Sequence, residues 1–187
     1  MTGPATDITK LLEGCIRRQP ASQKELVRRY AATLLSVARR YARTADAAED
    51  ILQDAYILIF RKIDQFRMEK GLLLAWMRKI VINTALSHYR NFRFQWEKTT
   101  DVFPEALETA PDVLAQLSFN EILVLITTLP EGPRTVFNLA IFDQYSHEEI
   151  ATLLQIPAGT SRSLLSRARK LLQEKILNRQ SHELARI

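Results

Sequence analysis

Apolar side chains recur at three- and four-residue steps along most of this 187-residue chain, and this spacing constrains its fold more than any other feature. Such a period places the apolar side chains on one face of an α-helix. Within residues 22–41 the residues that recur at these steps are Leu26, Tyr30, Leu34, Val37 and Tyr41. Glycine and proline are scarce, at 5 and 7 residues, and the alternating pattern typical of strands is rare. The sequence therefore predicts an all-α fold.

The helical pattern has one long interruption, which predicts two small domains. We expect helices over Ile8–Arg18, Ser22–Tyr41, Ala45–Phe66, Leu72–Arg90, Val113–Thr128, Arg134–Phe142, Ser146–Leu154 and Pro157–Leu177. Between Phe92 and Pro111 the period is lost and threonine and proline accumulate. We therefore expect a helical domain over residues 1–94, a flexible acidic linker over 95–112 and a second helical domain over 113–187.

Capping signals mark several helix starts, and the last two helices have a recognisable arrangement. Thr44 or Asp46 is suited to cap the third helix, and Ser146 with Glu149 has the spacing of a capping box. A short helix, a break at residues 154–156 and a longer basic helix follow one another at the C-terminal end. This order is typical of a helix-turn-helix.

Composition excludes several classes of function. The formal net charge of +5 and the pI near 9.5 favour an anionic partner such as nucleic acid. A single cysteine, Cys15, excludes an internal disulfide and a cysteine-rich zinc site. His88, His147 and His182 are isolated in the sequence, and neither a catalytic constellation nor a glycine-rich phosphate loop is present. We expect no enzyme activity, no metal and no cofactor.

Neither end nor interior of the sequence resembles a membrane segment. No run approaches the roughly 18 apolar residues that a bilayer-spanning helix needs, and the N-terminus lacks the pattern of a signal peptide. We expect a cytoplasmic protein without membrane insertion.

Two stretches lack acidic residues altogether while carrying several basic ones. The first, Lys70–Trp96, contains Lys70, Arg78, Lys79, Arg90 and Arg93. The second, Ser161–Gln173, contains Arg162, Arg167, Arg169 and Lys170. A basic surface free of carboxylates suits a polyanionic backbone, because each neutralised phosphate releases counterions. An ordinary solvated face would normally mix both signs of charge.

The last helix divides into an apolar and a polar side. We expect a buried stripe formed by Leu164, Leu165, Ala168, Leu171 and Leu172. The residues expected to point away from it are Ser161, Arg162, Ser166, Arg167, Arg169 and Lys170. Because the first turns of a recognition helix meet base edges, Ser161 and Arg162 are candidates for bases and the later basic residues for phosphates. Lys170 is equally well explained as an ordinary surface residue.

Two other helices add distinct polar features. On Ala45–Phe66, one side carries Asp46, Glu49, Asp50, Gln53 and Asp54. This acidic face would repel DNA but suits docking onto a basic protein surface, with simple solvation as the alternative. On Leu72–Arg90, the spacing of Trp76 favours core packing, whereas the amide of Asn83 needs a partner in the protein or in a base.

Several sequence blocks resemble extracytoplasmic-function (ECF) sigma factors of the sigma-70 family, in the expected order from about Ala21 to Leu177. Region 2 of that family is similar to Ala48–Asp54, Asp64–Phe66, Ala75–Ile80 and Asn83–Ala85. Region 4 is similar to Leu129–Pro130, Arg134, Val136–Phe137, Ser146, Glu148–Ala151, Gly159–Ser163, Leu165 and Arg167–Arg169. Three residues differ from the usual pattern, namely Ser87 in place of an acidic residue, Ser161 in place of a valine and Leu164 in place of a basic residue.

The resemblance implies a subunit that binds core RNA polymerase and gives it promoter specificity. It implies that the clamp of the β′ subunit is bound by Glu49, Asp50, Gln53 and Asp54. It assigns the minus-ten element, which this region also melts, to Arg78, Lys79, Asn83 and Arg90. It assigns the minus-thirty-five element to Thr160, Ser161, Arg162, Ser166, Arg167 and Arg169. The β flap and an anti-sigma factor are further implied partners, and the acidic linker would occupy a polymerase channel.

Two other functions are compatible with part of the sequence. A helix-turn-helix regulator acting without polymerase would explain Ser146–Leu177 but not the acidic face. A helical adaptor or scaffold would explain the amphipathic helices but not two separate basic stretches without carboxylates.

Overall fold

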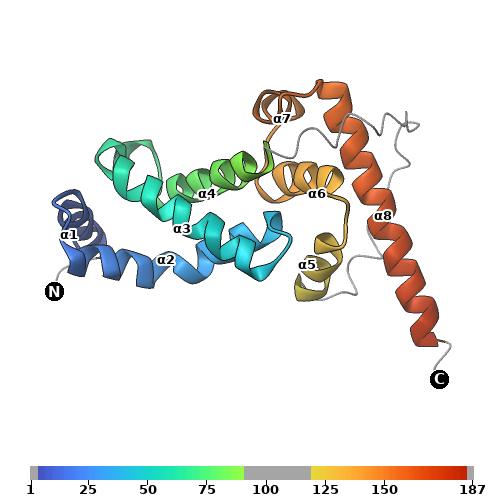
Figure 1. Cartoon of the computed structure of the whole chain (residues 1–187), viewed down its shortest axis with the longest axis horizontal. Coiled ribbons are helices and arrows are strands. Elements are labelled where there is room, and N and C mark those ends of the chain that lie inside the picture. The colour runs from blue at the N-terminus through green and yellow to red at the C-terminus, as the bar shows by residue number, and fades with distance from the viewer. Residues whose placement is uncertain (1–3, 91–118, 185–187) are drawn as a thin grey trace. The chain divides into compact units, whose positions relative to one another are not determined.

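The computed structural model of the chain describes residues 4–90 and 119–184, and within them the side chains of residues 7–88, 121 and 123–178. These residues form helices and turns without a strand, so the all-α prediction is confirmed for them (Figure 1). The chain divides into two compact units, Met1–Asn91 and Phe92–Ile187. The predicted linker over 95–112 lies outside the described residues, as do the predicted domain boundaries at 94 and 113.

The first unit is a small bundle in which α2 is the central helix. Its elements are α1 (Pro4–Ile16), α2 (Pro20–Tyr41), α3 (Ala45–Lys62), η1 (Ile63–Gln65), η2 (Met68–Lys70) and α4 (Leu73–Arg90). Helix α2 packs against α1, α3 and α4, and α3 also packs against α4. The largest fully buried side chains of this unit are Leu26, Leu34, Tyr41, Ile51, Ile59, Met77 and Val81. Each helix thus buries one apolar stripe, as the spacing predicts.

The second unit is built around α8. Its elements are α5 (Phe119–Thr127), α6 (Glu131–Phe137), the π-helical turn η5 (Asn138–Phe142), α7 (His147–Leu154) and α8 (Ala158–Leu184). Helix α8 packs against α5, α6 and α7 (Figure 1). Its core includes Ile126, Leu129, Val136, Leu139, Ile150, Leu165, Ala168, Leu172 and Ile176. None of the helices in the described part of the chain has the length and apolar character needed to cross a bilayer.

The caps agree with the sequence, while some helix ends differ from it. The Oγ1 atom of Thr44 accepts a hydrogen bond from the backbone N–H of Ala47 at 3.1 Å, so Thr44 rather than Asp46 caps α3. Both hydrogen bonds of the capping box between Ser146 and Glu149 are present at α7. Helix α3 ends at Lys62 instead of continuing to residue 66. The helix expected over 134–142 begins at residue 131 and widens into η5 from residue 138.

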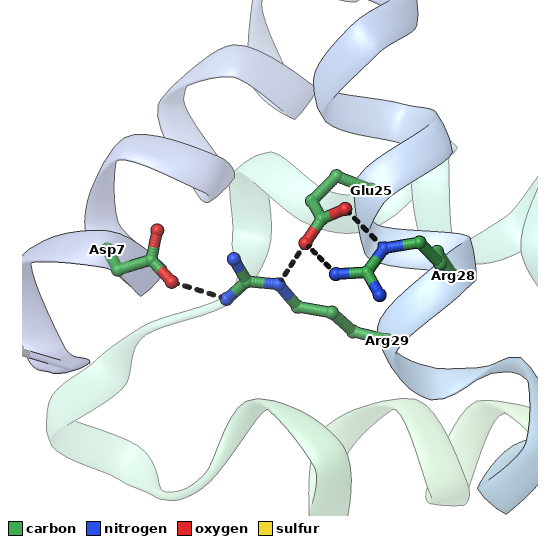
Figure 2. Close-up of polar contacts among 4 residues, drawn as sticks. All are labelled: Asp7, Glu25, Arg28 and Arg29. Atoms are coloured by element: carbon green, nitrogen blue, oxygen red, sulfur yellow. Dashed lines mark hydrogen bonds and ion pairs between the residues drawn. The ribbon is translucent and has the colours of Figure 1, made fainter.

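An exposed ion-pair network fastens α1 to α2, as Figure 2 shows. Arg29 Nη1 lies 2.6 Å from Asp7 Oδ2 on α1, and Arg29 Nε donates to Glu25 Oε1 at 2.6 Å. Arg28 Nε donates to the second oxygen of the same carboxylate at 2.7 Å. Hydrogen bonds from Arg28 and Arg29 lower the pKa of Glu25 from 4.5 to about 2. The carboxylate of Glu25 therefore orients the guanidinium that reaches α1.

Leu34→Ala tests the core of the first unit. Leu34 is 0% exposed, so the substitution leaves a cavity and should lower the free energy of unfolding by about 2–5 kcal/mol. The matched control is Ile57→Ala, at a side chain that is 51% exposed, and it should change stability by about 0.5 kcal/mol or less. Urea unfolding followed by circular dichroism measures both variants, and equal losses would contradict the assigned core.

Glu25→Gln tests the network between α1 and α2 through its pH dependence. A lowered carboxylate pKa stabilises the folded state above the unfolded value near 4.5, and this contribution is lost as the pH falls toward about 2. The stability difference between wild type and variant should therefore be small but constant near neutral pH and should shrink over this acidic window. Unfolding curves at a series of pH values measure it, with Glu13→Gln on α1 as a control for charge removal. A difference that grows on acidification would contradict the assigned contacts.

Candidate nucleic-acid and polymerase interfaces

The outer face of α3 is acidic and exposed. The side chains of Glu49, Asp50, Gln53 and Asp54 are all exposed, whereas Ile51, Ala55 and Ile59 on the other side of the helix are buried. The predicted orientation of the acidic face is therefore confirmed. An isoleucine that the sequence did not single out, Ile57, lies three residues after Asp54 and is also exposed. The face consequently offers an apolar contact beside its carboxylates.

One carboxylate of this face also contacts α4. Nε2 of His88 lies 2.9 Å from Oδ2 of Asp54, and because a carboxylate oxygen only accepts, the imidazole is the donor. His88 therefore makes a contact between helices that its position in the sequence did not indicate. This contact between residues 34 positions apart places an acidic group beside the stretch of α4 that contains none of its own.

Helix α4 presents part of its predicted polar set to solvent. Lys79 and Asn83 are exposed and lie four residues apart, on the same face of the helix. Arg78 is half-buried, and the side chain of Arg90 lies outside the described residues. On the inner side Met77, Val81 and Ala85 are buried. The face that carries Lys79 and Asn83 is thus available to a partner.

Trp76 is half-buried, and its ring lies 5.5 Å from that of Phe66, measured between ring centroids. This contact agrees with the packing role that its spacing favours.

A tight turn joins α7 to α8. Helix α7 ends where Gln155 adopts a left-handed conformation, with φ of 55° and ψ of 46°, and α8 begins three residues later at Ala158. The left-handed residue redirects the chain and stops the preceding helix, as such residues commonly do. The two helices are in contact with each other, and the predicted helix-turn-helix is present.

Ser161 does not point outward, and the expectation that it faces the DNA groove is wrong. Its side chain is 0% exposed, and its Oγ atom lies 2.8 Å from Nδ1 of His147 on α7. The residue lies four and seven positions before Leu165 and Ala168, so it belongs to the buried stripe of α8. In the family pattern that the sequence resembles, a valine is usual at this position. That apolar residue was the sequence signal for a buried side chain.

The remaining candidates on α8 are accessible to different degrees. Thr160, Arg162 and Arg169 are exposed, and Ser166 and Arg167 are half-buried. Arg162, Ser166 and Arg169 follow at steps of four and three residues, so they share one stripe beside the buried one. Thr160 and Arg167 are seven residues apart and share another. The structure therefore divides the predicted set between two flanks of the helix.

Arg162 has a protein partner that the sequence did not indicate. Its Nη2 atom donates a hydrogen bond to Oε1 of Glu148 on α7 at 3.0 Å, and both side chains are exposed. No periodicity within one helix could have revealed this contact, because it depends on how the turn sets α7 against α8.

Comparison with known families and proteins agrees with this geometry. The family model for Sigma-70 region 2 matches residues 26–94, and that for Sigma-70, region 4 matches residues 119–172. The chain is 31% identical over 162 residues to the RNA polymerase sigma-H factor of Pseudomonas aeruginosa, covering 80% of this chain and 83% of the relative. It is 32% identical over 178 residues to the ECF RNA polymerase sigma-E factor of Escherichia coli K12, covering 86% and 91%.

A solved structure also resembles the chain. The sigma factor RpoE, in a co-crystal structure with the anti-sigma factor NepR from Bartonella quintana, matches with a TM-score of 0.50 and 27% identity. The match covers 83% of this chain and 96% of that one. Because two relatives above 30% identity are spanned over most of their length, and because both region models match in order, the chain belongs to the ECF RNA polymerase sigma factors of the sigma-70 family.

Proposed function

We propose that this chain binds core RNA polymerase through the outer face of α3 and directs it to promoters through α4 and α8. The observation that carries the proposal is the distribution of charge over exposed faces. Helix α3 presents carboxylates, while α4 and α8 present cations in stretches that contain no acidic residue. In this proposal the protein contributes binding rather than a catalytic step, and it works in the cytoplasm with the polymerase.

The exposed acidic residues of α3 suit a basic surface of the β′ clamp. Glu49, Asp50, Gln53 and Asp54 supply acceptors at three- and four-residue steps along one face. Charge complementarity of this kind steers association and selects the partner. The exposed Ile57 adds an apolar group at the C-terminal end of the face, and its burial on binding would be favourable.

Two promoter elements are assigned to two helices. For the minus-ten element, Lys79 and Asn83 are the exposed pair on α4, and Arg78 and Arg90 complete the proposed set. A cation and an amide on one face suit a phosphate and a base edge respectively. Single-strand binding near this helix would favour melting of the element.

For the minus-thirty-five element, the first exposed arginine of α8 is the proposed base reader. Arg162 lies in the second turn of a helix that begins at residue 158, where a recognition helix meets base edges. The other proposed contacts are Thr160, Ser166, Arg167 and Arg169. Ser161 is not among them, since its hydroxyl is buried and bonded to α7.

We also propose an anti-sigma factor as a regulatory partner. The solved relative with a TM-score of 0.50 was crystallised with one. Such a partner would compete with polymerase for exposed faces of this chain.

Asp54→Arg tests polymerase binding. Reversing one charge of the acidic face should weaken the affinity for core polymerase about tenfold, because a carboxylate that meets a basic surface becomes a repelling cation. Affinity is measured by fluorescence anisotropy with purified core enzyme, followed by promoter-dependent transcription. The control is Glu13→Arg, which makes the same charge change at an exposed residue of α1 and should leave the affinity unchanged.

The same experiment distinguishes the alternative functions. Wild-type protein that binds duplex DNA without polymerase, and does not migrate with core enzyme, would instead indicate a helix-turn-helix regulator. Equal weakening by Asp54→Arg and Glu13→Arg would contradict the assignment of the α3 face.

Ser161→Ala tests the corrected role of Ser161. Removing the hydroxyl leaves Nδ1 of His147 without its partner, so the free energy of unfolding should fall by about 1–3 kcal/mol. Base preference at the minus-thirty-five element should stay the same. Ser163→Ala is the control, because the Ser163 hydroxyl donates to a carbonyl of its own helix. A changed base preference with unchanged stability would return Ser161 to the DNA-reading set.

A further inference from the structure

Two adjacent polar contacts join α7 to α8. His147 contacts Ser161 at 2.8 Å, and Glu148 contacts Arg162 at 3.0 Å, so consecutive residues of one helix meet consecutive residues of the other. The first contact is closed off from solvent at the serine, whereas the side chains of Arg162 and Glu148 are 59% and 69% exposed. The contact between His147 and Ser161 therefore holds α7 and α8 together. The contact between Glu148 and Arg162 instead acts on the orientation of the Arg162 side chain.

Glu148 is not required to cap its helix. The neighbouring carboxylate of Glu149 already completes the cap, because its Oε2 atom accepts hydrogen bonds from the backbone N–H of Ser146 at 2.8 Å and from its hydroxyl at 3.0 Å. An exposed ion pair such as that between Glu148 and Arg162 adds little to stability. The carboxylate of Glu148 nevertheless lies directly beside Arg162, the first exposed arginine of α8, and residues 161–173 of this helix contain no acidic residue.

A carboxylate at this place affects the arginine in two ways. The guanidinium has several N–H donors in a rigid plane, and a hydrogen bond from Nη2 to Glu148 restricts that plane while leaving other donors free for a base. The negative charge also opposes a phosphate approaching the same spot. Phosphate contacts carry no sequence information, so disfavouring them raises the ratio of specific to non-specific binding.

We propose that Glu148 is a specificity-determining residue of the minus-thirty-five reader. It orients Arg162 toward a base edge and repels the DNA backbone from the same guanidinium. This inference rests on the proposed function, because it needs α8 to read the upstream element. It adds to DNA recognition a residue of α7 that is acidic, whereas the charged residues proposed on α8 are basic.

The test compares Glu148→Gln with wild type in reconstituted holoenzyme. Glutamine keeps a hydrogen-bond acceptor and the side-chain length but removes the charge. We expect binding to a duplex with a scrambled minus-thirty-five element to become about threefold tighter, since one repulsion of phosphate is lost. We expect discrimination against a substituted base pair in the correct element to fall about fivefold, since the arginine is held less firmly. Affinity for the scrambled element should therefore rise while base discrimination falls. A loss of folding would not produce this combination.

Two controls locate the effect at Arg162. Glu174→Gln removes the same charge at a position about 18 Å from Arg162 along the axis of α8. This separation exceeds the screening length of ~8 Å at physiological salt, so base discrimination should stay unchanged. In an Arg162→Ala background, Glu148→Gln should no longer change discrimination, because its effect acts through the guanidinium. Unfolding midpoints of all variants are measured in parallel.

The outcomes separate this inference from the proposed function. If Arg162→Ala reduces selection of the minus-thirty-five element but Glu148→Gln leaves discrimination unchanged, the role of Glu148 is overturned and the proposed function stands. If Arg162→Ala does not alter selection of the element, both the assignment of Arg162 and the role of Glu148 are overturned. If Glu148→Gln lowers binding to correct and scrambled elements by the same factor, the pair has only a structural role and the inference is likewise overturned.

Discussion

Burial of one apolar stripe on each helix is the constraint on which the rest of this structure depends. In α8, the stripe that contains Leu165, Ala168 and Leu172 packs toward α5 and α6. Once this stripe is buried, the helical period decides which side chains face away from it. The same reasoning applies to α3, where burial of Ile51, Ala55 and Ile59 turns the carboxylates outward. The composition of the exposed faces is thus a consequence of core packing.

Electrostatics then distinguishes the exposed faces from one another. The sequence concentrates acids on α3 and leaves the stretches Lys70–Trp96 and Ser161–Gln173 without any, and the fold modifies this division at both stretches. A carboxylate of α3, Asp54, contacts His88 of α4, and a carboxylate of α7, Glu148, contacts Arg162 of α8. Each basic stretch therefore has an acidic neighbour on another helix. Such a neighbour can orient a donor and limit indiscriminate attraction to phosphate.

The parts of the structure that follow from local rules were predictable from sequence. Hydrophobic period and capping residues placed most of the helices, and Ser146 with Glu149 marked the start of α7 correctly. The ends of α3 and α6 were less predictable, since a 3₁₀ turn and a π-helical turn replace α-helix there. These departures have no strong local signal, because the apolar spacing continues through them.

Sequence by itself determined the class of fold, the composition of each face and the resemblance to ECF sigma factors, because these depend on residue order and helical period alone. Tertiary structure decided that His88 and His147 have partners and that Glu148 reaches Arg162. These contacts join residues 14 or 34 positions apart on different helices. Their formation depends on the angle and register at which two helices pack, and a one-dimensional pattern carries neither quantity.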